Sequence, residues 1–185
     1  MTAPVFVDTN ILIYALDDAD LKKQQAARLW RSELWKSRRG RVSFQVLQEF
    51  YVKVSRKVPS AREQARAEVR DLLAWRPIMV DFIVLEEGWK IQDRYLLSFW
   101  DALIVAAAKL LSCRYLLTED LQADQDLDGV LVVNPFVCDP ASLPLRRALC
   151  IPKQKITISS KLISVCYSLA FGCRLSFSFA FAQRV

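Results

Sequence analysis

The sequence predicts an α/β fold in which helices cover both faces of a mainly parallel central sheet. Short apolar runs alternate along the chain with longer segments whose apolar residues recur at helical spacing. The runs at 5–8, 115–117 and 130–133 are almost wholly apolar, which is typical of strands buried on both faces of a parallel sheet. The chain has 185 residues, 53% of them apolar and 25% charged, which is enough for one globular domain with a sizeable core.

Turn and cap residues set the order of the predicted elements. Ser43 is a favoured N-cap, and Lys57-Val58-Pro59 ends the helix that Ser43 begins. The segment that starts at Phe99 is the most apolar of the helices. In chain order we expect strand 5–8, helix 10–16, helix 22–36, a basic turn at 38–41, helices 44–56 and 61–74, strand 78–80, helices 84–95 and 99–112, and strands 115–117 and 130–133.

The composition changes near Pro140, which divides the chain into a predicted folded domain at 1–140 and an atypical tail at 141–185. The first part holds 19 Lys and Arg against 20 Asp and Glu, whereas the tail holds 7 Lys and Arg and no acid. The net charge of +6 therefore comes from the tail and says little about what the body binds.

The tail is rich in Ser, Phe and Leu, and three interpretations of it stay open. It is a segment unrelated to the body, such as a frameshifted or read-through end that is disordered or non-native; or a membrane-surface anchor; or an ordinary extra structural element. A membrane-spanning helix is excluded, because Lys161 and Arg174 bracket only twelve uncharged residues. Such a helix needs roughly twenty, so we expect no membrane-embedded segment.

The residue types that are missing exclude several kinds of site. The chain has no histidine, which removes that side chain as a general base and as a metal ligand. Its five cysteines contain no C-x-x-C pair, so neither a zinc site nor a disulfide framework is indicated. The sequence begins Met-Thr-Ala-Pro and enters a strand at once, without a secretory signal, so we expect a cytoplasmic protein.

Four carboxylates occupy positions that predict a shared site. Asp8 ends a buried strand at a strand-to-helix turn, and Asp120 follows the strand 115–117 in the same way. Ligands bind at the carboxyl ends of parallel strands, so both acids face a crevice there. Glu49 and Asp101 hold comparable positions near helix starts. Four such acids repel each other unless a cation lies between them, and an all-oxygen ligand set favours Mg²⁺ or Mn²⁺.

Each acid also has a structural explanation. Asp8 suits a turn or an N-cap, although Thr9 or Asn10 would cap equally well and leave Asp8 available for function. Asp101 fits a capping box with Ser98, in which it would reach back to the Ser98 amide. We nevertheless expect a functional role for Asp101, because it stands at the mouth of the most buried helix, where a cap need not be an acid.

Glu49 and Asp120 have structural explanations of a similar kind. Glu49 could pair with Lys53 one helical turn away, but its position at the edge of the apolar face calls for a buried partner. Asp120 could be a turn or cap residue, and the adjacent Glu119 would point elsewhere. A nearby run of alternating aspartates at 124, 126 and 128 lacks the sixth-position glycine and twelfth-position glutamate of a calcium loop, so we interpret it as a solvated loop.

The sequence resembles the PIN-domain nucleases, and within them the VapC-like ribonuclease toxins of type II toxin–antitoxin pairs. Four stretches carry the resemblance, in order along residues 4–136: Val-Asp8-Thr-Asn-Ile-Leu-Ile-Tyr-Ala, Ser-Phe-Gln-Val-Leu-Gln-Glu49-Phe-Tyr-Val, Leu-Ser-Phe-Trp-Asp101-Ala-Leu-Ile-Val-Ala-Ala-Ala and Leu-Leu-Thr-Glu-Asp120-Leu-Gln. The chain departs from the pattern after Asp120, where relatives often have a glycine-containing turn and this sequence has Ala123-Asp124.

This resemblance implies a three-layer α/β/α fold, RNA cleavage with Mg²⁺ or Mn²⁺, a homodimer, and inhibition by a cognate antitoxin. Asp8 and Asp101 would then be the primary metal ligands, with Glu49 and Asp120 completing the shell or orienting the water. The apolar surface of helices 22–36 and 44–56 would suit an antitoxin peptide.

Substrate contacts are less specific in the sequence. Lys and Arg side chains that could follow a phosphate backbone, or could simply be solvated, are Lys22, Lys23, Arg28, Arg38, Arg39 and Arg41. Tryptophans that could include a base-stacking platform, although core or interface packing explains most of them, are Trp30, Trp35, Trp75, Trp89 and Trp100.

Other functions compete with the toxin. A receiver-like domain would also place an acid at a strand end, but it needs a Lys after a late strand, and the late strands here end at Thr118 and Asn134-Pro135. A catalytically inactive PIN-like scaffold would bind metal without turnover. A nuclease of housekeeping RNA processing would have the same site, and the sequence does not separate it from a toxin.

Overall fold

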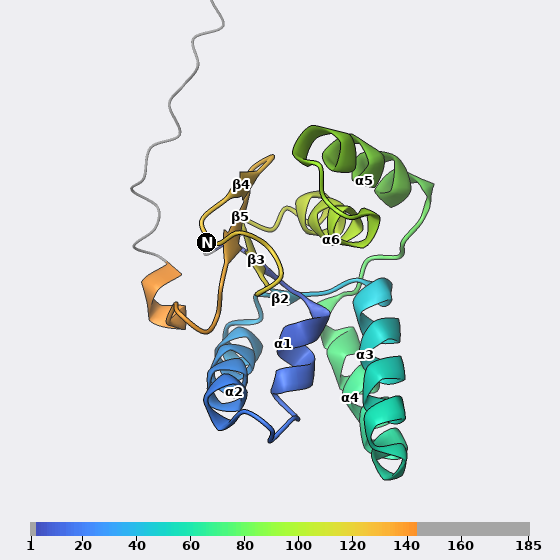
Figure 1. Cartoon of the computed structure of the whole chain (residues 1–185), viewed down its shortest axis with the longest axis vertical. Coiled ribbons are helices and arrows are strands. Elements are labelled where there is room, and N and C mark those ends of the chain that lie inside the picture. The colour runs from blue at the N-terminus through green and yellow to red at the C-terminus, as the bar shows by residue number, and fades with distance from the viewer. Residues whose placement is uncertain (1–2, 144–185) are drawn as a thin grey trace, which may run out of the picture. The chain divides into compact units, whose positions relative to one another are not determined.

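A five-stranded sheet forms the centre of the fold in the computed structural model, which describes residues 3–143 (Figure 1). The strands are β1 (Val5–Val7), β2 (Gly40–Arg41), β3 (Tyr115–Leu117), β4 (Asp126–Leu127) and β5 (Val130–Val133). They lie in the order β2-β1-β3-β5-β4. The pairs β1–β2, β1–β3 and β3–β5 are parallel, and only β4 runs antiparallel to its neighbour. The mainly parallel sheet predicted from the sequence is confirmed.

Helices flank this sheet. They are α1 (Thr9–Tyr14), α2 (Leu21–Ser37), α3 (Phe44–Lys57), α4 (Arg62–Leu72), α5 (Phe82–Tyr95) and α6 (Phe99–Leu110), with two 3₁₀ turns, η1 (Pro59–Ala61) and η2 (Leu73–Trp75). In Figure 1, α5 and α6 lie on one side of the sheet, at the top right, and α1 to α4 lie on the other side. The expected three-layer α/β/α arrangement is therefore confirmed.

Polar side chains at strand-to-helix junctions start the helices. The Ser43 hydroxyl accepts a hydrogen bond from the backbone of Val46, as expected for the cap of α3. Asp20 and Asp81 cap α2 and α5 in the same way, each with one carboxylate oxygen that accepts two backbone N–H bonds. These side chains satisfy N–H groups that the first helical turn leaves without partners.

Three short segments differ from the sequence prediction. The expected basic turn at 38–41 contains strand β2, which pairs with β1 through Val5 and Gly40. The expected strand at 78–80 is reduced to a single bridge between Ile78 and Ser43. The expected loop around Asp126 contains β4. Each segment pairs through only one or two residues, which is too short for a periodic pattern to predict.

The core covers both faces of the sheet, and α6 is the helix with the longest buried stretch. Phe6, Leu116 and Leu117 are fully enclosed at the centre of the sheet, and the apolar stretch 102–108 of α6 is buried along its whole length. Four of the seven side chains in that stretch are alanines, which let the helix backbone approach its neighbours closely. This packing fixes the two strands, β1 and β3, whose ends carry Asp8 and Thr118.

Several sequence predictions fall partly or wholly outside the described residues. Apart from 141–143, the tail lies outside them, as do Cys150, Cys166 and Cys173. Cys113 and Cys138, which the structure does describe, are buried free thiols. Within residues 3–143, no helix combines the length and the apolar character that crossing a membrane requires.

Gly40 tests how tightly β2 is held against the rest of the fold. A Cβ atom added there would lie 2.5 Å from two ring atoms of Trp75, which is itself buried. We expect Gly40→Ala to lower the free energy of unfolding by roughly 1–3 kcal/mol in urea titrations, because the rigid indole cannot move aside. Gly88→Ala is the matched control, with a smaller loss, because its Cβ would meet the flexible end of Leu103 at 2.8 Å. Equal losses in the two variants would contradict this account of β2.

Candidate active site at the strand ends

The register of two neighbouring strands brings the first two polar groups of the site together. Val7 of β1 pairs with Leu117 of β3, so the next residues, Asp8 and Thr118, leave the sheet at the same edge. The backbone N–H of Asp8 donates to the Leu117 carbonyl at 3.1 Å. The Thr118 hydroxyl then donates to Asp8 Oδ2 at 2.8 Å. A parallel pair of buried strands thus positions the central carboxylate of the site.

Asp8 is the most buried acid of the site, with 5% of its surface exposed. Its Oδ1 accepts the backbone N–H of Thr9 at 2.6 Å, so Asp8 itself is the N-cap of α1. The expectation that Thr9 or Asn10 would cap the helix and leave Asp8 uncommitted was wrong. The backbone at Asp8 is extended, with φ −77° and ψ 161°, which is the conformation of a capping residue.

Burial sets the protonation of Asp8. Desolvation raises the pKa of this carboxyl to about 6, against the opposing effect of the hydrogen bonds from Thr118 and Thr9. The negative charges of Asp120 and Glu49 raise it further. Asp8 therefore lies in an environment that disfavours its charge, which is the situation that a bound cation would relieve.

Glu49 reaches the site from the second turn of α3. Its Oε2 accepts the Thr9 hydroxyl at 3.2 Å, and its Oε1 accepts the Gln45 amide at 3.0 Å. The surface ion pair with Lys53 is also present. Because the two groups are 3.9 Å apart and Lys53 is exposed, this pair contributes little to the stability of the fold. Glu49 thus has both the ordinary helix-surface partner and the inward contacts that its sequence position predicts.

Asn10 and Thr118 hold Asp120. The Asn10 amide donates to Asp120 Oδ2 at 3.0 Å and to the Thr118 hydroxyl at 3.3 Å. The backbone N–H of Asp120 also donates to that hydroxyl, at 3.1 Å. The turn is therefore closed by the side chain of Thr118, and the Asp120 carboxylate is not needed to cap it.

Asp101 is not part of the hydrogen-bond network that links the other three acids. It lies in the first turn of α6, where the Ser98 hydroxyl donates to Asp101 Oδ2 at 2.7 Å and accepts the Asp101 backbone N–H at 3.2 Å. The capping partner is the Ser98 side chain, rather than the Ser98 amide that the sequence suggested. No hydrogen bond among the described residues joins Asp101 to Asp8, Glu49 or Asp120. The structure brings three of the four predicted site residues into one network.

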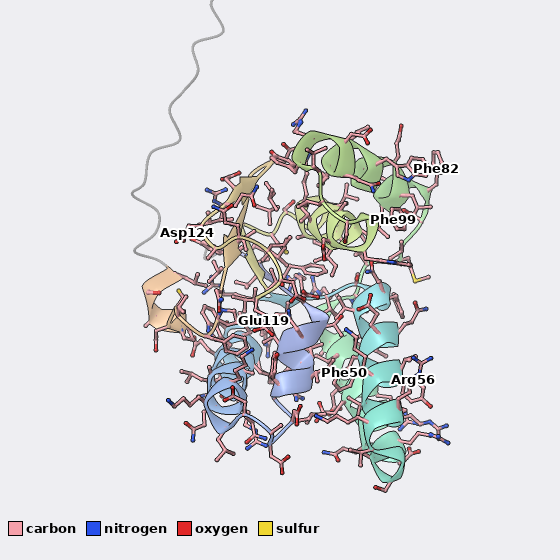
Figure 2. The ribbon with its side chains drawn as sticks, viewed as in Figure 1. Phe50, Arg56, Phe82, Phe99, Glu119 and Asp124 are labelled. Atoms are coloured by element: carbon pink, nitrogen blue, oxygen red, sulfur yellow. The ribbon has the colours of Figure 1, made fainter. Side chains whose placement is uncertain are left out.

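Glu119 points away from this network, as expected. Its carboxylate (Figure 2 labels Glu119) accepts a hydrogen bond from Lys23 Nζ at 2.6 Å, and Lys23 also donates to the Tyr14 hydroxyl at 3.1 Å. The pKa of Tyr14 is raised, first by its hydrogen bond to Glu119, and that of Lys23 is raised by the same carboxylate. This contact ties α2 to the segment that carries Asp120.

The other basic candidates mostly make internal contacts. Arg28 and Arg39 each donate to a backbone carbonyl, those of Ala15 and Ala3. Arg41 donates to two carbonyls in its own turn. The fit of these side chains to a phosphate backbone therefore stays a prediction, and it is weakest where the guanidinium already has a partner.

The aspartate run at 124–128 is not a calcium loop. Asp128 accepts hydrogen bonds from Arg94, Lys109 and Tyr95, at 2.6, 2.9 and 2.8 Å. Burial would raise the pKa of Asp128, but these three partners outweigh it and lower the pKa to about 2. Asp124, labelled in Figure 2, is exposed, whereas Asp126 pairs with Arg114 and Asp128 fastens the segment to α5 and α6, so the expected solvated loop was wrong for these two residues.

Two buried oxygens in the network lack any hydrogen-bond partner among the described residues: Asn10 Oδ1 and Gln45 Oε1. Both are side-chain carbonyls, and each belongs to a residue whose amide group donates to a site carboxylate. Together with the carboxylates of Asp8, Glu49 and Asp120 they make an oxygen-rich set of side chains linked by hydrogen bonds. That donor chemistry fits Mg²⁺ or Mn²⁺.

The side chains are nevertheless not drawn together around one point. Within the described part of the chain, no three acid or thiol side chains are close enough to hold one ion between them. Sequence reasoning missed Thr118 and Gln45 as members of the network. Thr118 had a usable signal, since it is a polar residue directly after a buried strand, as Asp8 is.

Comparisons with known proteins agree with this architecture. The family model described as PIN domain matches residues 5–125. None of the curated proteins matches the chain. A toxin–antitoxin complex from Klebsiella pneumoniae has a similar fold, with a TM-score of 0.52 and 22% identity over 71% of this chain and 97% of that chain.

Two further solved structures have slightly lower TM-scores. VapC20 of Mycobacterium tuberculosis, a toxin that cleaves the sarcin–ricin loop, has a TM-score of 0.49 and 24% identity over 60% of this chain and 86% of its own. VapBC2 of Rickettsia felis, bound to a DNA fragment from its promoter, has a TM-score of 0.49 and 16% identity over 70% of this chain and 97% of its own.

The burial of Asp8 predicts that Asp8→Asn changes the free energy of unfolding in EDTA by an amount that depends on pH. Because the folded pKa of about 6 lies above the ordinary aspartate value of 3.8, the carboxyl favours the folded state most below pH 4 and least above pH 6. The free energy of unfolding of the variant minus that of the wild type should therefore increase by roughly 2–3 kcal/mol between pH 4 and pH 8. Urea titrations at both pH values measure it. A difference that does not change with pH would contradict the burial of a charged Asp8.

Thr118→Val tests the hydroxyl that links the network. The substitution keeps the shape of the side chain but removes the hydrogen bond that lowers the pKa of Asp8. We expect that pKa to rise above about 6 in a carboxyl ¹³C NMR titration without metal. Thr118→Ser, which keeps the hydroxyl, should leave the pKa near its wild-type value. An unchanged Asp8 titration in the valine variant would show that the Thr118 contact is not formed.

Proposed function

The chain belongs to the PIN domain family, and from this premise we propose that it is a metal-dependent endoribonuclease that hydrolyses phosphodiester bonds in RNA. The observation that carries the proposal is the network at the carboxyl ends of β1 and β3. There, the charges of Asp120 and Glu49 raise the pKa of Asp8, and the buried side-chain carbonyl oxygens of Asn10 and Gln45 have no hydrogen-bond partner among the described residues. A cation placed among these acids would relieve the repulsion that raises the pKa of Asp8, and the same cation would bind a phosphate.

Asp8 and Asp101 would be the primary ligands of Mg²⁺ or Mn²⁺, and Glu49 and Asp120 would complete the shell. Such an ion, when bound, supplies charge neutralisation at a phosphodiester oxygen and acidifies a water molecule. A cation beside Asp8 would also lower the raised pKa of that carboxyl, so the acid would be fully ionised at neutral pH.

The chain's own hydrogen bonds orient the remaining acids. Asn10 fixes Asp120 through Oδ2, and no described residue donates to Asp120 Oδ1, which is available to accept a proton from water. Glu49 is fixed through both oxygens, by Thr9 and Gln45, and so has a more defined direction. We therefore assign proton acceptance to Asp120 and positioning of the site to Glu49.

We further propose that this nuclease is a VapC-like toxin of the cytoplasm, paired with an antitoxin and active as a homodimer. The four ordered motifs around Asp8, Glu49, Asp101 and Asp120 support this, since they follow the pattern of those toxins. Exposed apolar side chains on α2 and α3, such as Leu29, Trp35 and Val52, suit an antitoxin peptide. The nuclease domain would then be residues 1–140.

One observation favours a second candidate, a PIN-like scaffold that binds partners without catalysis. Among the described residues, no three acid side chains are close enough to hold one ion between them, and an incomplete ligand set would bind metal weakly and leave phosphodiesters uncut. Metal binding without turnover distinguishes this candidate from the nuclease.

The full chain incubated with a pool of structured RNA tests the nuclease directly. We expect cleavage with Mg²⁺ or Mn²⁺ and none with EDTA, read on denaturing gels. Asp101→Asn should reduce the rate by at least roughly 100-fold, or about 3 kcal/mol of transition-state stabilisation. Asp93→Asn, which removes an exposed acid on α5, is the matched control and should cleave like the wild type.

Two results would contradict the proposal in different ways. Metal binding without any cleavage would support the inactive scaffold. Cleavage that survives Asp101→Asn, or that continues in EDTA, would mean that the nuclease activity does not come from this site.

A further inference from the structure

One aromatic side chain is exposed at the end of the helix that carries Asp101. Trp100 directly precedes Asp101 in the first turn of α6, and 61% of its surface is exposed. The next seven residues of α6, at 102–108, are all buried. Helix α6 is therefore mostly buried, but next to Asp101 it exposes the large aromatic ring of Trp100 to solvent.

The other tryptophans make packing contacts or hydrogen bonds within the fold that give each of them a structural role. Trp30 is buried and its indole N–H donates to the carbonyls of Pro135 and Cys138, both at 3.1 Å. Trp75 is buried and packs against Trp35, with ring centroids 5.6 Å apart. Trp89 meets Phe82 along α5, at 6.2 Å.

Trp100 is held from one side only. Its single ring contact among the described residues is with the preceding Phe99, whose centroid lies 5.2 Å away at 66° (Figure 2 labels Phe99). Phe99 is partly buried against the core, so it anchors the neighbouring ring while much of the Trp100 surface stays exposed. A ring that is anchored and still exposed loses little conformational freedom when a flat partner stacks on it.

The turn before α6 adds a second exposed apolar group. Leu96 is 90% exposed and adopts a left-handed backbone conformation, with φ 54°. A leucine in that region costs roughly 1–2 kcal/mol relative to the right-handed form, and its side chain gains no burial here. Leu96 and Trp100 thus lie on either side of Ser98, the cap residue that bonds Asp101.

From these observations we propose that Trp100 stacks on a base of single-stranded RNA beside the scissile phosphate; this rests on the proposed nuclease function. The acids are suited to the phosphate through a cation, but they have no means of holding a base. Stacking on an aromatic ring supplies that contact and accepts any base, since each has a flat π-face. The alternative is that Trp100 contacts a second copy of the chain. The experiment below distinguishes this contact from RNA binding.

The test uses the full chain with Asp120→Asn, so that RNA is not cut in Mg²⁺. Two fluorescein-labelled probes are compared by anisotropy: a mixed-sequence twelve-nucleotide single-stranded RNA, and an oligonucleotide with the same backbone and no bases. We expect Trp100→Ala to weaken binding of the base-containing RNA by roughly 5- to 150-fold. Binding of the abasic probe should change by less than about 2-fold. Trp100→Phe should keep most of the affinity, and Trp89→Ala is the control for loss of an exposed tryptophan.

Three results would overturn the proposal. These are unchanged RNA binding by Trp100→Ala, an equal loss for both probes, or a shift to a smaller assembly on size exclusion, which would assign Trp100 to a contact between copies. Wild-type cleavage is measured separately. If the wild type binds RNA through Trp100 and does not cut it, the nuclease proposal fails and the stacking contact stands.

Discussion

The hydrogen bond from the Thr118 hydroxyl to Asp8 is the interaction on which the site depends. It joins the ends of two buried parallel strands, and its existence follows from their register, in which Val7 faces Leu117. The same hydroxyl accepts the Asn10 amide and the Asp120 backbone N–H. One side chain therefore uses its donor and both acceptor positions to connect α1, β1 and the segment after β3.

That connection has an electrostatic consequence. The strands are buried, so the carboxylate at their end is buried too, and its pKa rises to about 6. The charges of two further acids, Asp120 and Glu49, raise that pKa. Among the described cations, Lys23 pairs with Glu119, and exposed Lys53 lies 3.9 Å from Glu49. The arrangement weakens the metal-free fold at neutral pH and gives the same groups a reason to bind a divalent ion.

Much of the fold and of the candidate site could be predicted from the sequence, but the shortest strands and the tertiary contacts of the site could not. The three buried strands, the helix caps and the positions of Asp8 and Asp120 follow from local apolar runs and the polar residues that end them. Strands β2 and β4 were missed because two-residue pairings have no period, and Ile78 forms only one bridge. The capping role of Asp8 depends on a backbone dihedral that Asp-Thr-Asn does not specify. The hydrogen-bond network that links Asp8, Glu49 and Asp120 but does not include Asp101 is a tertiary relation, which the position of each acid in the sequence does not reveal.

The most direct test of a cation site centred on Asp8 is calorimetric titration of the full chain with Mn²⁺, in buffers of different ionisation enthalpy. Because the metal-free pKa of Asp8 is about 6, binding at pH 6 should release a fraction of a proton, and binding at pH 8 almost none. Asp8→Asn should lose both the high-affinity binding and the proton release. Binding of Mn²⁺ that releases no proton at pH 6, or that is unaffected by the substitution, would contradict the account.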